Sequence, residues 1–508
     1  MKMFRKLAII FTITIILSNS VFAQIQKLDE YFQKSLIEWK IPGMAIAIIR
    51  NDSVIFAKGY GVKDISKPDK VDENTLFGIA SNTKAFTSAS IALLVEENKL
   101  NFDDKVQKYL SYFELYNDYV SQNMTITDLL CHRSGLVTFS GDLLWYSTNY
   151  SRGDIVRRIK YLKPKYDFRT TYGYSNLMFL TAGEIIPKLT NKSWDEFISE
   201  RFFVPLNMKN TNSSISKFGT NQNVAQPHDL IDGKIQKLRY ISWDNIAPAG
   251  AINSSVADMS NWIRMLLNNG KFEGKTIISE ESLKKLWSPQ TIKELGRFEE
   301  KYTPSTHFST YGLGWELFDY HGRKIVNHSG GLDGMISKVV LVPEEKLGFV
   351  ILTNSINWLP DALMYKVLDT YLSTENFDWS NLFYRFYEGN NEYEKEEFAK
   401  KESERNKNTK PTLELEKYCG TYNSILYGDC EVKLEKGKLQ IQLLPAPDFI
   451  SKLENWQNDT FSVKFEKFPS LPQGTVSFTI NEKSQVTNMK IDVPNPDFDF
   501  TELEFLKK

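Results

Sequence analysis

An apolar stretch that begins at Leu76 contains a serine and a lysine three residues apart, and this pair constrains the chain more than any other feature. Ser81 and Lys84 stand in Ser-Asn-Thr-Lys, and the apolar run behind them predicts a helix to about Asn98. Residues three apart on a helix lie on one face, one turn apart. A helix N-terminus favours a developing alkoxide, and a desolvated lysine can take the serine proton. The pair therefore predicts a nucleophile with its base built into one turn.

The S-x-x-K pattern is weak evidence by itself, because it occurs three times in the chain. Ser214 with Lys217, and Ser282 with Lys285, match it equally well. A capping serine beside a solvated lysine explains most such matches. The apolar context favours Ser81, and the rest of the chain has to decide.

Composition places the chain among ordinary globular proteins of two or three domains. It has 508 residues, 25% of them charged, and a net charge of −1. This balance gives no argument for nucleic acid or for an anionic membrane surface as a partner. Residues 1–23 combine a basic start, a short apolar core and a Val-x-Ala ending, which predicts a signal peptide and a mature start at Gln24. We therefore expect an exported protein, periplasmic or secreted, with no membrane span in its mature form.

The three cysteines leave two alternatives open. Cys419 and Cys430 flank a predicted hairpin and either pair in an oxidising compartment or, together with Cys131, are unrelated thiols. The chain has neither C-x-x-C nor H-E-x-x-H, and its five histidines are scattered. We expect neither a metal nor an organic cofactor.

The order of predicted elements indicates two folded units. A helix over 25–40, a β-hairpin over 43–57, and an antiparallel meander over 311–353 with helices between them indicate a sheet flanked by helices. A highly charged stretch over 392–410 reads as a solvated helix or linker. Short alternating strands then predict a small all-β unit; they cover residues 438–443, 461–465, 474–479 and 500–505.

Two further motifs carry residues suited to acyl transfer. Tyr174-Ser-Asn176 stands at a loop-to-helix junction, where a tyrosine can exchange a proton and an asparagine can hold a carbonyl or a lysine. His328-Ser329-Gly330-Gly331 precedes a strand, and its glycines let a ligand approach the backbone N–H groups. Taken alone, Tyr174-Ser-Asn176 is better explained as a packed tyrosine beside a helix cap, and the His328 motif has a glycine-rich turn as its alternative. For His132, in a short helix closed by Gly135, we favour a structural role.

The ordered set S-x-x-K, Y-x-N and H-x-G resembles the penicillin-recognising serine hydrolases, which include class C β-lactamases, DD-carboxypeptidases and related esterases and peptidases. The resemblance covers roughly residues 25–372 and implies a β-lactamase/transpeptidase-like fold. That is an antiparallel sheet flanked by helices, with an all-helical subdomain. The C-terminal unit is similar to the lipocalin-like β domain often appended to such enzymes. The implied layout is a signal peptide (1–23), a hydrolase domain (24–375), a charged linker (376–411) and an all-β domain (412–508).

The resemblance also assigns roles to residues. Ser81 is the acylated nucleophile, Lys84 its base, and Tyr174 the proton relay to the leaving group. The residues that contact the substrate or its oxyanion are Asn176, His328, Ser329, Gly330 and Gly331, with the backbone N–H groups of Ser81 and Gly331 forming the oxyanion hole.

Two departures from the family pattern bear on the substrate. His328 stands where K-T-G enzymes have a lysine that holds a substrate carboxylate, which favours the peptidase and esterase branches over a true β-lactamase. Phe168-Arg169 stands where Pro-Gly is common, so the loop before Tyr174 has its own shape.

The sequence thus predicts an exported serine hydrolase that cleaves a small peptide, amide or ester, with D-amino-acid-containing cell-wall peptides among the candidates. Hydrolysis of β-lactams and a non-catalytic penicillin-binding or cell-wall-binding role are the alternatives. The sequence does not fix the exact substrate, the role of the β domain or the oligomeric state.

Overall fold

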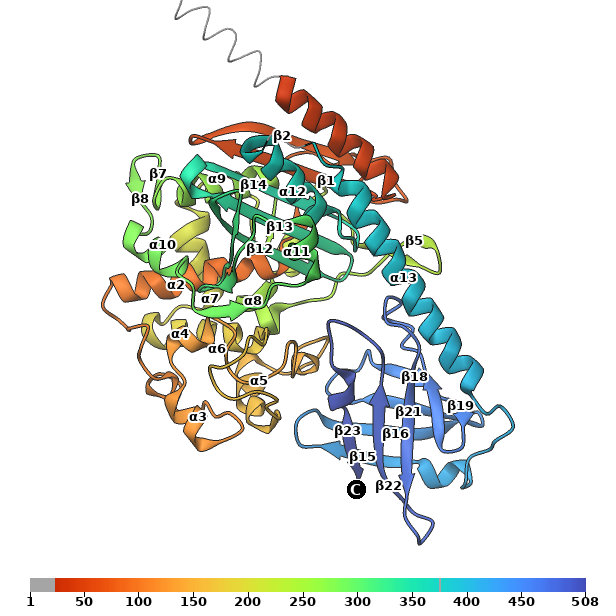
Figure 1. Ribbon diagram of the computed structural model, residues 1–508. Helices are drawn as coiled ribbons and strands as arrows, with labels where there is room; N and C mark the ends of the chain where they lie inside the picture. The colour runs from red at the N-terminus through yellow and green to blue at the C-terminus, as the bar shows by residue number, and fades with distance from the viewer. Residues whose placement is uncertain (1–22, 374–375) are drawn as a thin grey trace, which may run out of the picture.

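The computed structural model describes residues 23–373 and 376–508 (Figure 1). The predicted signal peptide lies outside the described residues except for Ala23. Among the described helices, none combines the length and the apolar character needed to cross a membrane.

An eight-stranded antiparallel sheet forms the centre of the larger unit. In spatial order its strands are β2 (Ser53–Gly61), β1 (Gly43–Arg50), β14 (Leu347–Thr353), β13 (Met335–Val342), β12 (Arg323–Leu332), β11 (Glu316–Tyr320), β10 (Ser309–Tyr311) and β9 (Thr291–Lys293). Ala45 and Ala47 of β1 belong to one hydrophobic core, and Ile46 and Ile48 belong to the other. Because both faces are covered, these strands read as continuous apolar runs instead of alternating ones.

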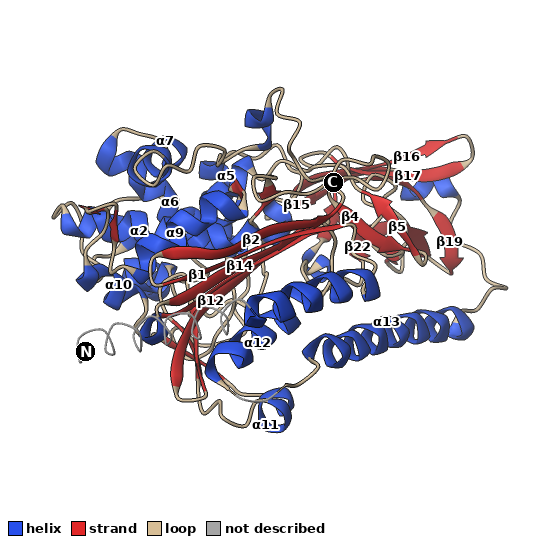
Figure 2. Ribbon diagram, turned by 90° about the horizontal axis from the view of Figure 1, so that it is seen from above, coloured by secondary structure: helices blue, strands red, loops and turns tan. Residues whose placement is uncertain are grey.

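Helices cover the two faces of this sheet (Figures 1 and 2). On one face α9 (Val256–Leu267) packs on β1 and β14, and α2 (Thr83–Glu96) packs against α9, where Phe86 stacks on Trp262 with ring centroids 3.9 Å apart. The other face carries the helix over residues 23–38, α12 (Leu359–Leu372) and α13 (Trp379–Glu404).

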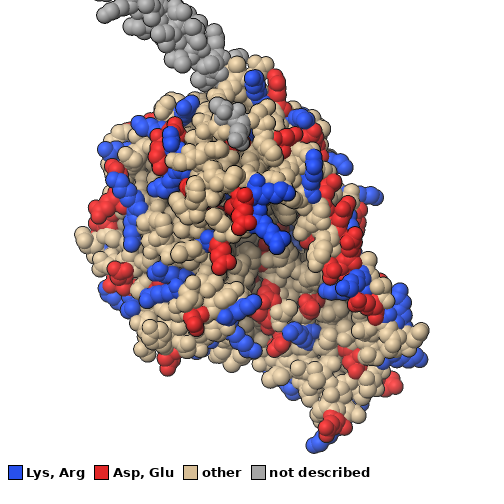
Figure 3. Space-filling view, viewed as in Figure 1, with Lys and Arg blue, Asp and Glu red and all other residues tan. Residues whose placement is uncertain are grey.

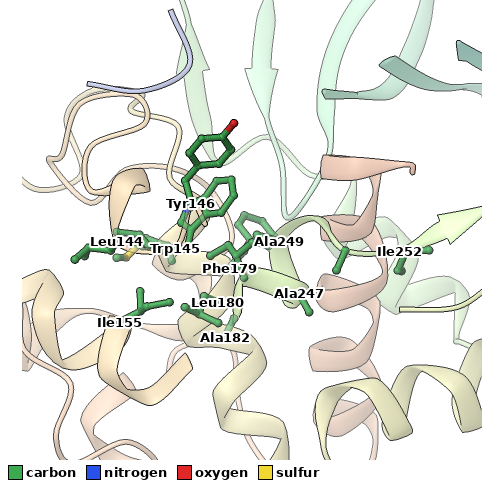
Figure 4. Close-up of a cluster of buried hydrophobic side chains, with 14 of the residues drawn as sticks. Leu144, Trp145, Tyr146, Ile155, Phe179, Leu180, Ala182, Ala247, Ala249 and Ile252 are labelled. Atoms are coloured by element: carbon green, nitrogen blue, oxygen red, sulfur yellow. The ribbon is translucent and has the colours of Figure 1, made fainter. Parts of the chain in front are cut away.

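A helical subdomain packs beside α2. Its helices are α3 (Asp118–Asn123), α4 (Ile126–Leu129), α5 (Arg152–Arg158), α6 (Asn176–Thr190), α7 (Trp194–Ile198) and α8 (Ala247–Gly250). Its buried core is visible in Figure 4, where Phe179 of α6 lies next to Ala249 of α8 and Trp145 packs nearby. The remaining short elements are α10 (Glu280–Leu286), α11 (Arg297–Tyr302) and the pairs β3 (Phe77–Gly78) with β6 (Asn253–Ser254), β4 (His228–Ile231) with β5 (Lys234–Lys237), and β7 (Lys271–Phe272) with β8 (Lys275–Thr276).

The C-terminal unit is a nine-stranded antiparallel sheet, reached through α13. In spatial order the strands are β18 (Ile450–Lys452), β17 (Lys438–Leu443), β16 (Gly428–Glu435), β15 (Gly420–Ser424), β23 (Glu504–Lys507), β22 (Val486–Asp492), β21 (Gly474–Ile480), β20 (Thr460–Val463) and β19 (Glu454–Gln457). The predicted fold class, a β-lactamase-like domain followed by an all-β domain, is confirmed. All three cysteines are free thiols, and Cys430 lies opposite Tyr422, which follows Cys419 by three residues along the chain.

Two predicted strands are wrong in detail. The meander predicted over 311–353 was expected to open with one strand over 311–317, but Gly314 has a φ of +80° and forms a turn that divides this stretch between β10 and β11. A side chain there would lie 2.4 Å from the Ser88 hydroxyl of α2, so the turn packs tightly on that helix. The stretch 500–505 begins with the 3₁₀ turn η10 (Phe500–Glu502), because the Asp499 carboxylate accepts from the Thr501 N–H and caps the turn.

Candidate active site

Ser81 lies in a 3₁₀ turn, η1 (Ala80–Asn82), that runs directly into α2. Ala80 just before it has a φ of +46°, a left-handed conformation that costs energy for a residue with a side chain and is typical of functional sites. Asn82 and Ser337 fix this turn to β13, since the Asn82 amide donates to the Ser337 hydroxyl, which donates to the Ile79 carbonyl. Ser81 itself is partly exposed.

Lys84 is fully buried, and its direct partners are uncharged oxygens. Its Nζ lies 2.9 Å from Ser81 Oγ, 2.6 Å from Asn176 Oδ1 and 2.9 Å from the Ala249 carbonyl. Burial lowers the pKa of Lys84 well below its usual range, and the negative charge of Asp142 opposes this effect.

These three partners suit a neutral lysine. The Asn176 and Ala249 oxygens can only accept, so two N–H groups of the amine satisfy them. The Ser81 hydroxyl can both accept and donate, so with a neutral Lys84 it can direct its proton at the amine lone pair. Lys84 can therefore act as a base toward Ser81 without rearrangement.

Asn176, the first residue of α6, is oriented by a residue that the sequence reasoning missed. Its Nδ2 donates to Asp142 Oδ2 at 2.6 Å, which turns its oxygen toward Lys84. Burial raises the pKa of Asp142 to about 7, and hydrogen bonds and Lys84 oppose the rise. In the sequence, the one hint that Asp142 orients Asn176 is that a charged residue stands between Gly141 and the apolar run Leu143-Leu144-Trp145.

Tyr174 lies over the Lys84 amine, with the nitrogen 4.8 Å from the ring centroid. Burial raises the pKa of Tyr174 well above its usual range, and a hydrogen bond with Ser81 only partly offsets this. The phenol therefore stays protonated, and it suits a proton donor better than a base.

His328 uses both ring nitrogens within the protein. Nδ1 lies 2.5 Å from the Ser329 carbonyl, which can only accept, so Nδ1 carries the proton and Nε2 accepts from the Tyr311 hydroxyl at 2.8 Å. Burial lowers the pKa of His328 to about 4, although Glu316 opposes this, and the ring is neutral at pH 7. In this state His328 has no free N–H for a substrate, although the family resemblance places it among the residues that contact the substrate.

A buried cation nevertheless lies beside the His328 motif. Lys338 of β13 donates to Ser329 Oγ at 2.8 Å and pairs with Asp361 at 2.9 Å, and its side chain is 5% exposed. Glu316 and Lys293 form a second ion pair close by at 2.7 Å, and these lysines overcome the effect of burial and lower the pKa of Glu316 to about 2. The sequence reasoning did not single out Lys338. A lysine within the otherwise mostly apolar run of β13 was the signal that could have revealed it.

The two glycines of the motif occupy different positions. A side chain on Gly330 would lie 2.2 Å from the Ile79 carbonyl and 2.9 Å from the Ser81 nitrogen, so only glycine lets β12 approach the nucleophile. Gly331 follows as an exposed residue. The backbone of β12 thus runs beside the Ser81 N–H, as an oxyanion site at this point requires.

The loop before Tyr174 is fixed by Arg169 and His132. Arg169 replaces the family's glycine and binds Asp128, with Nη2 2.6 Å from Oδ2. His132 accepts from the Ser175 N–H at 3.0 Å, and its ring packs 4.2 Å from the Tyr174 ring centroid. These contacts support the structural role favoured for His132.

In the two other S-x-x-K matches the serine of the motif does not contact the lysine of the same motif. Ser214 contacts Asp244, and Lys217 donates instead to Ser213. Ser282 donates to the Glu96 carboxylate. Only the first match brings the two side chains together.

The fold and this constellation define a serine hydrolase of the penicillin-recognising type, and comparison with known proteins agrees. The family model described as Beta-lactamase matches residues 28–369, and a domain of unknown function (DUF3471) matches residues 404–507. The chain belongs to the β-lactamase family of serine hydrolases.

Named relatives and solved structures extend the comparison. The chain is 30% identical over 429 residues to the "Unguisins hydrolase ungD'" of Aspergillus campestris, covering 78% of this chain and 75% of that protein. It is 30% identical over 345 residues to "Protein flp" of Staphylococcus aureus strain MRSA252, covering 65% and 62%. The octameric penicillin-binding protein homologue from Pyrococcus abyssi shares the fold with a TM-score of 0.62 at 21% identity, covering 95% of this chain and 100% of that one. The penicillin-binding protein from Bacillus halodurans matches with a TM-score of 0.55 at 19% identity, covering 66% and 99%.

Proposed function

We propose that the protein is an exported serine hydrolase that cleaves a peptide, amide or ester bond through an acyl-enzyme on Ser81. The observation that carries this proposal is the position of Lys84, a fully buried amine held by two obligate acceptors and by the nucleophile itself.

The geometry supports the following sequence of steps. Lys84 takes the Ser81 proton as Oγ bonds to the substrate carbonyl carbon, and the oxyanion lies at the Ser81 and Gly331 N–H groups. Tyr174 gives its proton to the leaving amine or alkoxide as that bond breaks, and it regains a proton from Lys84. Water then gives a proton to Lys84 as its oxygen bonds to the ester carbonyl carbon. The bond between that carbon and Ser81 Oγ breaks, Lys84 returns the proton to Oγ, and the acid product leaves.

Two features bear on the substrate. Lys338 offers a cation beside Ser329, which favours substrates with a carboxylate near the cleaved bond, such as a C-terminal peptide residue or a β-lactam. One relative is named as a hydrolase, which is compatible with a hydrolytic reaction in this chain. On the face drawn in Figure 3, basic and acidic side chains are interspersed around a central hollow, so that face carries no extended patch of one sign.

The test is a substrate panel on residues 24–508, with chromogenic esters, D- and L-aminoacyl anilides and a chromogenic cephalosporin. We expect Ser81→Ala to lose several orders of magnitude in turnover, because nucleophile and base act as a unit. The matched control is Ser214→Ala, which removes a serine from another S-x-x-K match. Fluorophosphonate labelling followed by peptide mapping should place the adduct on Ser81. Near-normal turnover by Ser81→Ala would refute the proposal, and cephalosporin turnover far above ester and anilide turnover would favour the β-lactamase alternative.

A further inference from the structure

The C-terminal domain reaches the helical subdomain of the hydrolase domain through a partly buried carboxylate, Glu502. Oε1 accepts from the Ser140 hydroxyl at 2.6 Å, and Oε2 accepts from the Gly141 N–H at 2.9 Å. The Tyr427 hydroxyl of the same domain also donates to Oε2. Glu502 therefore acts as a cap for a turn that lies 361 residues away in the sequence.

That turn carries the residue that orients the catalytic amide. Gly141 has a φ of +78° and precedes the 3₁₀ turn η3 (Asp142–Leu144), and a side chain on Gly141 would lie 2.7 Å from Leu177 of α6. Asp142 follows directly and accepts from Asn176, whose oxygen accepts from Lys84. One short path of hydrogen bonds and backbone thus joins the C-terminal domain to the catalytic base.

Other contacts hold the two domains together independently of Glu502. Arg158 donates to the Ile425 and Leu426 carbonyls at 3.0 and 2.9 Å, and Arg239 pairs with Asp448 at 2.6 Å. Tyr146 packs on Phe498 with ring centroids 4.2 Å apart, and the Tyr146 hydroxyl in Figure 4 points away from the hydrophobic cluster. A change at Glu502 alone should therefore leave the domains docked.

The charges near Glu502 determine whether its carboxylate raises or lowers the pKa values of Asp142 and Lys84. Burial raises the pKa values of both Asp142 and Glu502, and the negative charge of Glu502 adds to the rise at Asp142. The other titratable groups that face the two carboxyls or Lys84 are Tyr174, Tyr427, Asp499, His132 and His328. Of all these groups, Asp142 is the one whose negative charge raises the pKa of Lys84 and so favours its protonated form.

We propose that Glu502 is a positioning residue for the hydrolase reaction, because it fixes the Ser140–Asp142 turn and limits the negative charge on Asp142, which leaves Lys84 free to act as a base. This inference rests on the proposed function and makes the C-terminal domain a working part of the catalytic site.

The test compares the pH dependence of kcat/KM in the full mature chain for the wild type, Glu502→Gln and the control Glu504→Gln. The new glutamine keeps an acceptor for the Gly141 N–H and the Tyr427 hydroxyl, and the Ser140 hydroxyl can turn to accept from its amide. Without the charge, Asp142 ionises more readily and stabilises protonated Lys84. The midpoint of the ascending limb should then move to higher pH by about half a unit, with about a threefold loss below it. Glu504 is exposed, with 60% of its side chain accessible, and its change should leave the profile unaltered.

The outcomes separate the inference from the proposed function. Wild-type labelling at Ser81 with an unshifted Glu502→Gln profile overturns the inference alone, and so does a uniform loss of rate at every pH, which indicates a merely structural contact. In an Asp142→Asn background, Glu502→Gln should cause no further shift, and an undiminished shift there also overturns it. A wild type that Ser81-directed probes do not label overturns the proposed function and this inference with it.

Discussion

Replacing Asp142 by asparagine tests the electrostatic setting of Lys84 most directly. Two hydrogen bonds of 2.6 Å, joined through the Asn176 amide, connect Lys84 to the Asp142 carboxylate. This geometry places the two charges about 7 Å apart, where they attract by about 2 kcal/mol at an effective dielectric constant near 20, so the Asp142 charge raises the pKa of Lys84. Since the pKa of Asp142 is about 7, its carboxyl is only partly ionised near neutrality, and about one unit of the effect should be visible.

The sign of the shift follows from the role of the lysine. Asp142→Asn removes the charge that favours the ammonium form, so the pKa of Lys84 should fall and the ascending limb of kcat/KM should move to lower pH. The assay is ester hydrolysis between about pH 5 and 9, with exposed Asp103→Asn as the control. A midpoint that stays in place, or that moves to higher pH, would refute the assignment of Lys84 as a base tuned by Asp142.

Stability provides a second readout of the same substitution, independent of activity. The pKa of Asp142 is raised in the folded state, so its contribution to stability is complete below the unfolded value of about 3.9 and is lost as the pH rises toward about 7. Asparagine does not titrate. The Tm of Asp142→Asn relative to the wild type should therefore be more favourable at about pH 8 than at about pH 5, and a difference independent of pH would contradict the raised pKa.

Two further substitutions test the proton relay and the cation. Tyr174→Phe keeps the ring that packs on His132, and it should lower turnover of an anilide by about 10² to 10⁴. It should affect a p-nitrophenyl ester much less, because that leaving group needs no proton; equal losses, measured against a Tyr172→Phe control, would argue against a relay. Lys338→Met removes the cation beside Ser329, leaves the partly exposed Asp361 without its ion-pair partner, and leaves Glu316 with Lys293 as its neighbouring lysine. This substitution should lower kcat/KM for a substrate with a free carboxylate about tenfold relative to kcat/KM for its methyl ester. An unchanged ratio of the two values would show that Lys338 does not bind the substrate carboxylate.

Much of the fold could be predicted from the sequence, because the signals are local. Continuous apolar runs in β1 and β14 and the long buried helix α2 follow from periodicity and burial alone. The errors lie where tertiary contacts or a local cap override the strand pattern. The turn at Gly314 exists because α2 leaves no room for a side chain there, and η10 exists because Asp499 caps it.

In the candidate site, too, local relations could be predicted from the sequence and long-range contacts could not. The relation of Ser81 to Lys84 spans three residues, so a motif can reveal it, and Tyr174 and Asn176 form a second short motif. Asp142 meets Asn176 across 34 residues and Glu502 meets Gly141 across 361, and neither stands in a recognisable pattern. The residues that set the charge of the site were therefore beyond single-sequence reasoning, although those that carry the chemistry were not.

The position of Lys338 changes what His328 implies about the substrate. Strand alternation puts residue 328 on the face of Lys84 and Tyr174, and it points Ser329 and Lys338 to the other face of the sheet. A substrate carboxylate would therefore meet Lys338 only at the edge of β12 beyond Asn327, where the pairing with β11 ends. A permanent cation at 328 would repel a proton on Lys84 and would also compete with it for the Asp142 charge, whereas neutral His328 leaves the Lys84 pKa to burial and Asp142. Lys338 meanwhile supplies a cation across the strand, balanced by Asp361. The loss of lysine from the motif therefore does not by itself exclude carboxylate-bearing substrates, and the Lys338→Met ratio decides the point.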